Sequence, residues 1–482
     1  MWSTLSHSFS KRTSISSRCH LILTLFVFLS FSVKELKSQS KDYQINCEIK
    51  GIDPGSTVFL LYIAGNTELK TANANASPTG KVQFILSDPL KPGTYKLLMQ
   101  NQKSFHLLIS HQQQIDVSCE LQNPIATMQV LNDDENKYYY QYLNTIEIHQ
   151  GHIDTLKHGL RKAKTTQDSI DFIKKGNAAI FAQNTLKNNF NKAHPYPILS
   201  RVINLSKEPA MTEAQLAKNI NPSAYLSYYK DHFLDNVDFN DSITLHLTEF
   251  QNKLSIDVLR VTKQDISSVW KEVTHILELS KNNREMYNYL VPYFTFCYDG
   301  SKINGMDEMF VKMANNYFLK NQTFWKDSFM LYRIQDRVNL ALPLLNGHKL
   351  PPMNLLGIDE MWHSSDEGMA DYTIVVFFDP DCKHCIKDVP ILKEYYDQVH
   401  PLGVNVYAVC IGPDQGKWKE FIEAHHLDWV NVADFERKFN LLSAYDVNSY
   451  PQFYLLDKEK NILAKKIDIE VLKQLLDSRL GR

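Results

Sequence analysis

Two cysteines three positions apart, Cys382 and Cys385, are the residues of this sequence best suited to carry chemistry. A C-x-x-C pair can open and close a disulfide, or it can supply half of a tetrahedral zinc site. Structural zinc needs a second ligand pair nearby, and the sequence has no other C-x-x-C. One H-x-x-H pair, His149 and His152, lies far upstream. We therefore expect thiol-disulfide exchange, with no metal and no cofactor.

The dithiol falls where a buried strand gives way to a helix. Residues 371–378 are mostly β-branched and aromatic, which is typical of a strand buried on both faces, and residues 386–399 form an amphipathic pattern. Free N–H groups and the dipole at a helix N-terminus stabilise an anion, so the thiolate of Cys382 is expected to attack. Cys385 lies one turn further on and would resolve the mixed disulfide.

Charged residues around the dithiol act on that thiolate in opposite directions. Lys383 and a protonated His384 would stabilise it, and both are predicted to modulate its reactivity. Asp379 and Asp381 bring negative charge to the same place and oppose them. Which side prevails depends on distances that a sequence does not contain.

Three further features resemble the thioredoxin family. Pro390 follows Cys385 by five residues, where the first active-site helix of that family is kinked. Tyr450 and Pro451 match its cis-proline loop, and the order of strands and helices over residues 344–482 matches as well. The resemblance implies that Tyr450 and Pro451 lie beside the dithiol and bind an extended substrate strand.

Within that family the sequence looks most like the TlpA/ResA branch of exported or membrane-tethered thiol-disulfide oxidoreductases. Val376 replaces the buried acid of thioredoxin, and Asp388 stands three residues after Cys385, where ResA-like proteins carry a glutamate. The resemblance implies that Asp388 takes the proton of Cys385, although a solvated carboxylate is an equal alternative. Asp381 and Phe378 depart from the branch, where tryptophan is common.

A peroxiredoxin is disfavoured by the residues before the first cysteine. Its pattern, P-x-x-x-T/S-x-x-C, requires a proline at position 375 and a hydroxyl residue at position 379. The sequence has Val375 and Asp379 there. Neither the proline nor the hydroxyl is present, so we do not expect peroxide chemistry.

The first 40 residues are predicted to be a signal peptide. Lys11, Arg12 and Arg18 precede an apolar run over residues 21–33. This run is shorter than the roughly 20 apolar residues of a spanning helix, although an uncleaved membrane anchor remains an alternative. We expect export to the periplasm or cell envelope, where disulfides persist.

Two further domains are predicted between the signal and the dithiol. Short runs of alternating apolar and polar residues over 41–133 indicate an all-β, sandwich-like domain. Its Cys47 and Cys119 take inward positions, either as a disulfide or as two buried thiols. Residues 134–343 show helical periodicity and indicate an all-α domain of about eight helices. Four of its tyrosines are expected to pack beside another domain: Tyr138, Tyr139, Tyr140 and Tyr142.

The chain is thus predicted to be multidomain and to end in an α/β thioredoxin-like domain over residues 344–482. This layout resembles exported oxidoreductases common in Bacteroidetes. The resemblance implies protein thiols and disulfides as substrates, a reductant role and a membrane-linked electron donor. A histidine such as His384 before the second cysteine also occurs in oxidants of the DsbA type, so the direction of electron flow stays open. A formal net charge of −2 gives no reason to expect nucleic acid as partner. The alternative is an envelope binding or interaction protein whose upstream domains carry the main role. The oligomeric state is not indicated.

Overall fold

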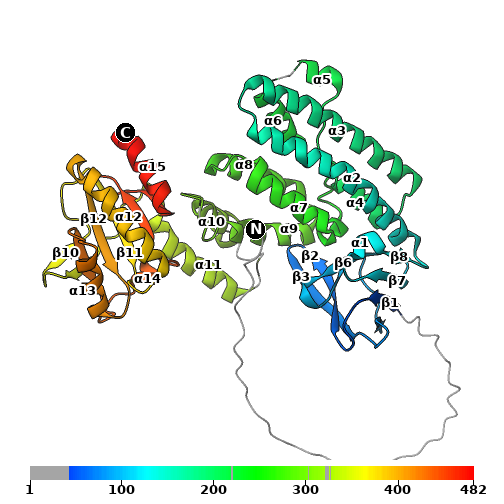
Figure 1. Ribbon diagram of the computed structural model, residues 1–482, viewed down its shortest axis with the longest axis horizontal. Helices are drawn as coiled ribbons and strands as arrows, with labels where there is room; N and C mark the ends of the chain where they lie inside the picture. The colour runs from blue at the N-terminus through cyan, green and yellow to red at the C-terminus, as the bar shows by residue number, and fades with distance from the viewer. Residues whose placement is uncertain (1–42, 219–220, 302, 321–324, 326) are drawn as a thin grey trace, which may run out of the picture. The chain divides into compact units, whose positions relative to one another are not determined.

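The computed structural model describes residues 43–482 except 219–220, 302, 321–324 and 326 (Figure 1). Within it a segment of strands is followed by a segment of helices and then by a mixed α/β segment, in agreement with the predicted fold class. The predicted signal peptide, residues 1–40, lies outside the described residues.

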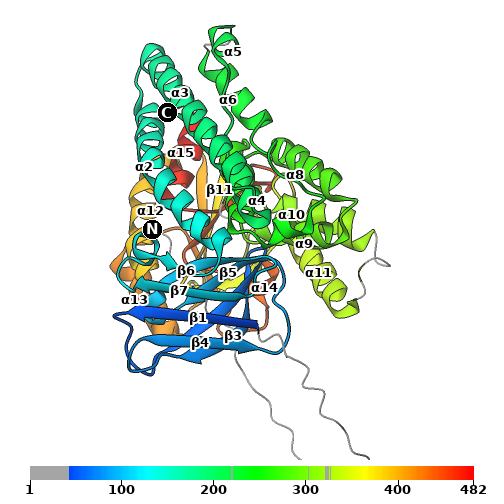
Figure 2. The same ribbon diagram turned by 90° about the vertical axis from the view of Figure 1, so that its right-hand side faces the viewer.

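The first segment is a sandwich of two four-stranded sheets, ordered β4-β1-β7-β8 and β3-β2-β5-β6. Figure 2 shows β1 beside β4, its antiparallel neighbour, whereas β1 runs parallel to β7 on its other side. The strands are β1 (Tyr43–Lys50), β2 (Thr57–Ala64), β3 (Thr67–Asn75), β4 (Lys81–Leu86), β5 (Gly93–Leu98), β6 (Ser104–Ile109), β7 (Gln114–Glu120) and β8 (Gln129–Val130). A short helix, α1 (Pro124–Thr127), precedes β8.

Cys47 and Cys119 lie inside this sandwich as two free, buried thiols. In the parallel register Cys47 is opposite Val117 and Cys119 is opposite Ile49, so both sulfurs face the core. Burial raises the pKa of Cys119 to about 12 and also raises that of Cys47. The sequence left open whether these cysteines form a disulfide or remain two buried thiols. In the structure they are two buried thiols.

The second segment is helical. Its α-helices are α2 (Asp134–Lys162), α3 (Thr166–Ala193), α4 (Pro197–Leu205), α5 (Glu213–Lys218), α6 (Pro222–Asp231), α7 (Thr248–Ile256), α8 (Ile266–Ser280), α9 (Arg284–Cys297), α10 (Glu308–Met313) and α11 (Ser328–Ala341). Two π-helical turns interrupt them, η3 (Asp257–Val261) and η4 (Ala314–Leu319). The expectation of about eight helices was too low for the part of the chain described. Helices α5 and α10 span six residues each, too few to show amphipathic periodicity.

Of the four tyrosines of α2, Tyr140 joins the helices to the sandwich, whereas Tyr138 and Tyr142 contact other residues of the helical segment. Tyr139, Tyr140 and Tyr142 are buried, and the Tyr140 hydroxyl donates to the carbonyl oxygen of His106 on β6 at 2.6 Å. Sandwich and helices therefore share one continuous hydrophobic core.

The third segment is a seven-stranded mixed sheet ordered β10-β9-β13-β12-β11-β14-β15. Its strands are β9 (Asn354–Gly357), β10 (Trp362–Ser364), β11 (Tyr372–Phe378), β12 (Val404–Cys410), β13 (Val430–Ala433), β14 (Gln452–Leu456) and β15 (Ile462–Ile467). The helices are α12 (Lys383–Val399), α13 (Gln415–Ala424), α14 (Leu441–Ala444) and α15 (Ile469–Leu480). Among the described helices, none is long and apolar enough to cross a membrane.

Strand β11 is buried on both faces, as its composition predicted. Ile374, Val376 and Phe378 face a core shared with α12, α13 and α15, whereas Val375 and Phe377 face a second core with Tyr445 and Tyr454. Position 376, where thioredoxin has an acid, is therefore filled by an apolar side chain in an apolar core.

The residues between β13 and α14 form a turn, and α14 begins only at Leu441. The carboxylate of Asp434 accepts the backbone N–H groups of Lys438 and Phe439, at 3.0 and 2.7 Å, and holds this turn. A carboxylate that bonds to nearby backbone N–H groups competes with helix formation in this way.

Candidate dithiol site

Cys382 occupies the position just before the first residue of α12. Strand β11 ends at Phe378, and the N–H of Cys382 donates to the carbonyl oxygen of Asp379 at 3.0 Å, which closes a tight turn between strand and helix. The backbone of Cys382 is extended, and its carbonyl oxygen accepts the N–H of Ile386 at 3.0 Å. The Cys382 sulfur is therefore at the end of α12 where the first-turn N–H groups have no partner within the helix.

The loop that carries Tyr450 and Pro451 lies against Cys382. The peptide bond between Tyr450 and Pro451 is cis, as the resemblance implied. The Cys382 thiol donates to the carbonyl oxygen of Tyr450 at 3.6 Å, although the two residues are 68 positions apart. The structure thus brings together both cysteines and the cis-proline loop.

Cys385 is the inner member of the pair. Its side chain is fully buried, whereas Cys382 is half-buried, and both thiols are free. Burial raises the pKa of the Cys385 thiol; the N–H of Asp379, 3.5 Å from its sulfur, opposes this, while Cys382 adds to it. Cys385 is therefore a protonated thiol at neutral pH, and it must lose a proton before it can attack.

The predicted accessory residues take different positions on the first turns of α12. Lys383 and His384 are exposed to solvent, and Asp388 is half-buried one turn beyond Cys385. A helix places residues i and i+3 on one face, so Asp388 and Cys385 share a face. The roles assigned to these three residues remain predictions.

One pairing at the site was absent from the sequence interpretation. The Lys417 ammonium group on α13 lies 2.8 Å from each carboxylate oxygen of Asp381. This exposed ion pair offsets one of the two negative charges near Cys382. No signal in the sequence connects the two residues, because they are 36 positions apart on different elements.

Gly412 was also missed, and its role is steric. A Cβ atom at this position would lie 2.8 Å from the carboxylate oxygen Oδ1 of Asp379. The absent side chain therefore leaves room for Asp379 beside the buried thiol. The Gly412-Pro413 dipeptide after strand β12 is a turn signal that could have drawn attention to it.

The remaining cysteines and the histidine pair lie away from this arrangement or inside a core. Cys410 is buried on β12 opposite Phe378, and Cys297 is half-buried at the end of α9. His149 and His152 are both on α2. Across the described part of the chain, no cluster of three His, Cys, Asp or Glu side chains could hold a metal ion.

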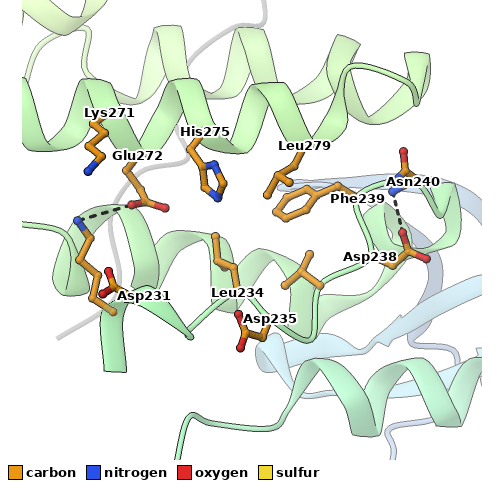
Figure 3. A pocket seen from close by; sticks show the side chains of 12 residues that line it. Asp231, Leu234, Asp235, Asp238, Phe239, Asn240, Lys271, Glu272, His275 and Leu279 are labelled. Atoms are coloured by element: carbon orange, nitrogen blue, oxygen red, sulfur yellow. Dashed lines mark hydrogen bonds and ion pairs between the residues drawn. The ribbon is translucent and has the colours of Figure 1, made fainter. Parts of the chain in front are cut away.

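A separate cavity of about 530 Å³ lies in the helical segment. Figure 3 shows Glu272, His275 and Leu279 of α8 on one side of it, with the ring of Phe239 beside Leu279, and Leu234 on the other side. The Lys230 ammonium group pairs with Glu272 at 3.6 Å. No cysteine lines this cavity, so it is distinct from the dithiol.

Comparisons with known proteins agree with this geometry. Residues 347–465 match the model of the AhpC/TSA family, and this range contains both cysteines and the cis-proline loop. The thiol-disulfide oxidoreductase ResA of Geobacillus thermodenitrificans is 27% identical over 135 residues, which cover 27% of this chain and 76% of the relative.

Solved structures from two other bacteria are also similar. A domain of a possible thiol-disulfide isomerase from Cytophaga hutchinsonii is 31% identical, with a TM-score of 0.27, and covers 29% of this chain and 95% of its own. A thioredoxin-like protein from Bacteroides caccae is 18% identical, with a TM-score of 0.46, and covers 56% of this chain and 96% of its own. By the family match and the ResA relative, the C-terminal region of this chain is a thioredoxin-like domain of the AhpC/TSA family, homologous to thiol-disulfide oxidoreductases.

Proposed function

We propose that this protein is an exported thiol-disulfide oxidoreductase that exchanges disulfides with proteins through Cys382 and Cys385. The observation that carries the proposal is the asymmetry of the pair. Cys382 is half-buried at the start of α12 with its sulfur 3.6 Å from the Tyr450 carbonyl oxygen, and Cys385 is buried behind it. An accessible first sulfur and a shielded second one suit attack followed by resolution.

In the first step, the thiolate of Cys382 attacks one sulfur of a substrate disulfide. A bond forms between that sulfur and the sulfur of Cys382, and the substrate S–S bond breaks. The other substrate sulfur leaves as a thiolate and takes up a proton. The unpaired N–H groups at the start of α12 stabilise the Cys382 thiolate before the attack.

In the second step, the thiol of Cys385 loses its proton and its sulfur attacks Cys382. An intramolecular disulfide forms and the second substrate sulfur leaves as a thiolate, so the substrate gains two electrons and the dithiol loses two. Burial raises the pKa of Cys385, so this step needs a proton acceptor. We assign that role to Asp388, one turn along α12.

The substrate is proposed to be an extended protein segment. Tyr450 and Pro451 lie beside Cys382, and backbone groups next to a cis proline are open to pair with an added strand. Acting as a reductant, the protein finishes each cycle as a disulfide. A membrane-linked electron donor would then return two electrons and two protons. The apolar run in residues 21–33 supports export, to the periplasm or cell envelope.

The test is to trap the intermediate of the first step. In Cys385→Ser, Cys382 can attack but nothing resolves the product, so a mixed disulfide with insulin should accumulate on a non-reducing gel and disappear with dithiothreitol. Cys382→Ser should form no adduct and reduce insulin only at the uncatalysed rate. Cys410→Ser is the matched control and should behave as wild type, because that thiol is buried in β12. Wild-type insulin reduction by Cys382→Ser would refute the proposal.

The second candidate is an envelope binding or interaction protein. It is favoured by the continuous core that the sandwich and helices share, which makes the upstream segments a substantial folded body of their own. Under this alternative the dithiol is secondary, and Cys382→Ser would keep full biological activity in the organism.

A further inference from the structure

The cis-proline loop is held in place by a residue of the helical segment. Arg337 lies on α11, and its Nη2 donates to the carboxylate of Asp446 at 2.8 Å across 109 positions of sequence. Its Nε donates to the carboxylate of Asp299 at 2.8 Å, so the guanidinium group joins two carboxylates. Asp446 follows α14 and precedes the loop that leads to Tyr450 and Pro451.

A chain of hydrogen bonds runs from Asp446 to the residue after Pro451. The carboxylate of Asp446 accepts from the side-chain amide of Asn448 at 3.0 Å. The backbone N–H of Asn448 donates to the side-chain oxygen of Gln452 at 3.4 Å, and the Gln452 amide donates to the carbonyl oxygen of Asp446 at 3.2 Å. The loop is thus closed on itself, with Asp446 as its connection to α11.

The buried carboxylate of Asp446 needs the positive charge of Arg337. Asp446 is buried, and burial alone would raise the pKa of its carboxyl. Hydrogen bonds and ion pairs with Arg337 and Lys466 outweigh that effect and hold the pKa well below its usual range. Without Arg337 the buried carboxylate would retain one cationic partner instead of two, and the loop would lose its tie to the helices.

Neighbouring contacts fix the helical segment against the same edge of the sheet. Lys465 on β15 forms a buried ion pair with Asp307. Asn304 donates to the carbonyl oxygen of Leu463 at 3.4 Å, and its side-chain oxygen accepts the N–H of Lys465 at 3.3 Å. Arg337 therefore reaches Asp446 from a helical segment that other contacts already hold against β15.

We propose that Arg337 is a positioning residue for disulfide exchange, through which the helical segment sets the conformation of the cis-proline loop that receives the substrate. This inference rests on the proposed function and extends it by assigning part of the substrate site to the helical segment. A protein substrate that pairs with the loop depends on this positioning. A small disulfide, which needs only access to the Cys382 sulfur, depends on it far less.

The experiment compares Arg337→Ala, Arg337→Lys and Arg333→Ala in the full chain. Arg333 is the matched control, since it lies one turn earlier on α11, is exposed and lies over the ring of Phe329 of its own helix. Two activities are measured: reduction of insulin, with KM and kcat separated, and reduction of a small aromatic disulfide. Hydrogen exchange of the amides over residues 447–453 is measured without any substrate.

For Arg337→Ala we expect KM for insulin to rise roughly five- to tenfold, within the usual range of coupling between contacting residues. Reduction of the small disulfide should change less than about twofold, and exchange over residues 447–453 should accelerate. Arg337→Lys should recover most of the loss, and Arg333→Ala should match wild type. Should Arg337→Ala fold poorly, Asp446→Asn removes the ion pair with Arg337 from the loop side, together with that of Lys466, and keeps the side-chain size.

Unchanged insulin KM and unchanged exchange in Arg337→Ala would overturn the inference, as would equal losses for insulin and the small disulfide. These outcomes are separate from failure of the proposed function. If Cys382→Ser reduced insulin like wild type, the dithiol mechanism would be refuted, while the exchange measurement would still report whether Arg337 holds the loop.

Discussion

At the scale of single residues, the two cysteines differ because they lie in different surroundings on one helix turn. Cys382 is at the open end of α12 and contacts the cis-proline loop, whereas Cys385 is enclosed by the core under β11. The proposed roles of attacking and resolving sulfur would therefore follow from position along the helix, since the two thiols are chemically identical.

The redox potential of this pair should identify the direction of electron flow. As a reductant, the protein should equilibrate with glutathione near thioredoxin's potential, roughly −270 mV. Thiol alkylation of Cys382 and Cys385 across a series of glutathione ratios measures it. A potential near that of DsbA, roughly −120 mV, would instead assign an oxidant. A pair that closes at no ratio would contradict the exchange mechanism altogether.

At the scale of elements, the parts that could be predicted are those whose apolar pattern is strong. Strand β1 and helix α12 were expected from periodicity, and strand β11 from its continuous run of β-branched and aromatic residues. Strand β3 was missed because its sequence, TELKTANAN, is almost entirely polar and exposed on a sheet edge. Strands β9 and β10 span four and three residues, too short for any alternation to be recognised.

In the candidate site, too, some features could be predicted from the sequence and others could not. Its cysteines and cis-proline loop could be predicted because residue type and spacing carry the signal. The pairings of Asp381 with Lys417 and of Asp446 with Arg337 could not, because each depends on how separate elements pack in three dimensions.

The start of α2 offers a test of how the helices are joined to the sandwich. Asn136 is fully buried, and its side chain donates to the carbonyl oxygen of Leu108 at 2.7 Å and accepts the N–H of Leu108 at 2.8 Å. Asn136→Ala would leave both backbone groups of β6 without these partners. We expect it to lower the free energy of unfolding by about 2–4 kcal/mol, measured by urea denaturation.

A variant on the exposed face of the same helix provides the comparison. Gln141→Ala removes an exposed side chain one to two turns later on α2 and should change the free energy of unfolding by less than about 0.5 kcal/mol. Equal stability of Asn136→Ala and Gln141→Ala would show that the Leu108 contact does not join the two segments.

At the scale of the whole molecule, two kinds of contact connect the three segments. The sandwich and the helices are joined by a continuous apolar core. The helices and the α/β segment are joined by two ion pairs, Arg337 with Asp446 and Asp307 with Lys465. These contacts respond differently to protons, because apolar contacts do not titrate.

Acid should therefore weaken the ion-paired contact between the helices and the α/β segment more than the apolar contact between the sandwich and the helices. Ion pairs hold the pKa of Asp446 below its unfolded value of about 3.9, so this carboxyl stabilises the fold above that pH. The stabilisation is lost as the pH falls further, through the folded pKa. Between about pH 5 and pH 2, the free energy of unfolding of wild type should fall more steeply than that of Asp446→Asn. Parallel slopes in urea titrations of the two proteins would contradict this.

Under the proposed function, the burial of Cys47, Cys119 and Cys410 would limit how much reducing power one molecule can deliver. Cys47, Cys119 and Cys410 are buried in hydrophobic cores, and burial raises the pKa of each thiol. They are therefore poor nucleophiles, and substrate disulfides do not reach them. Under the proposed function, the Cys382–Cys385 pair would then supply two electrons per cycle. Acting as the proposed reductant, each molecule would have to be reduced again after every disulfide that it opens, and its turnover would be limited by the supply of electrons.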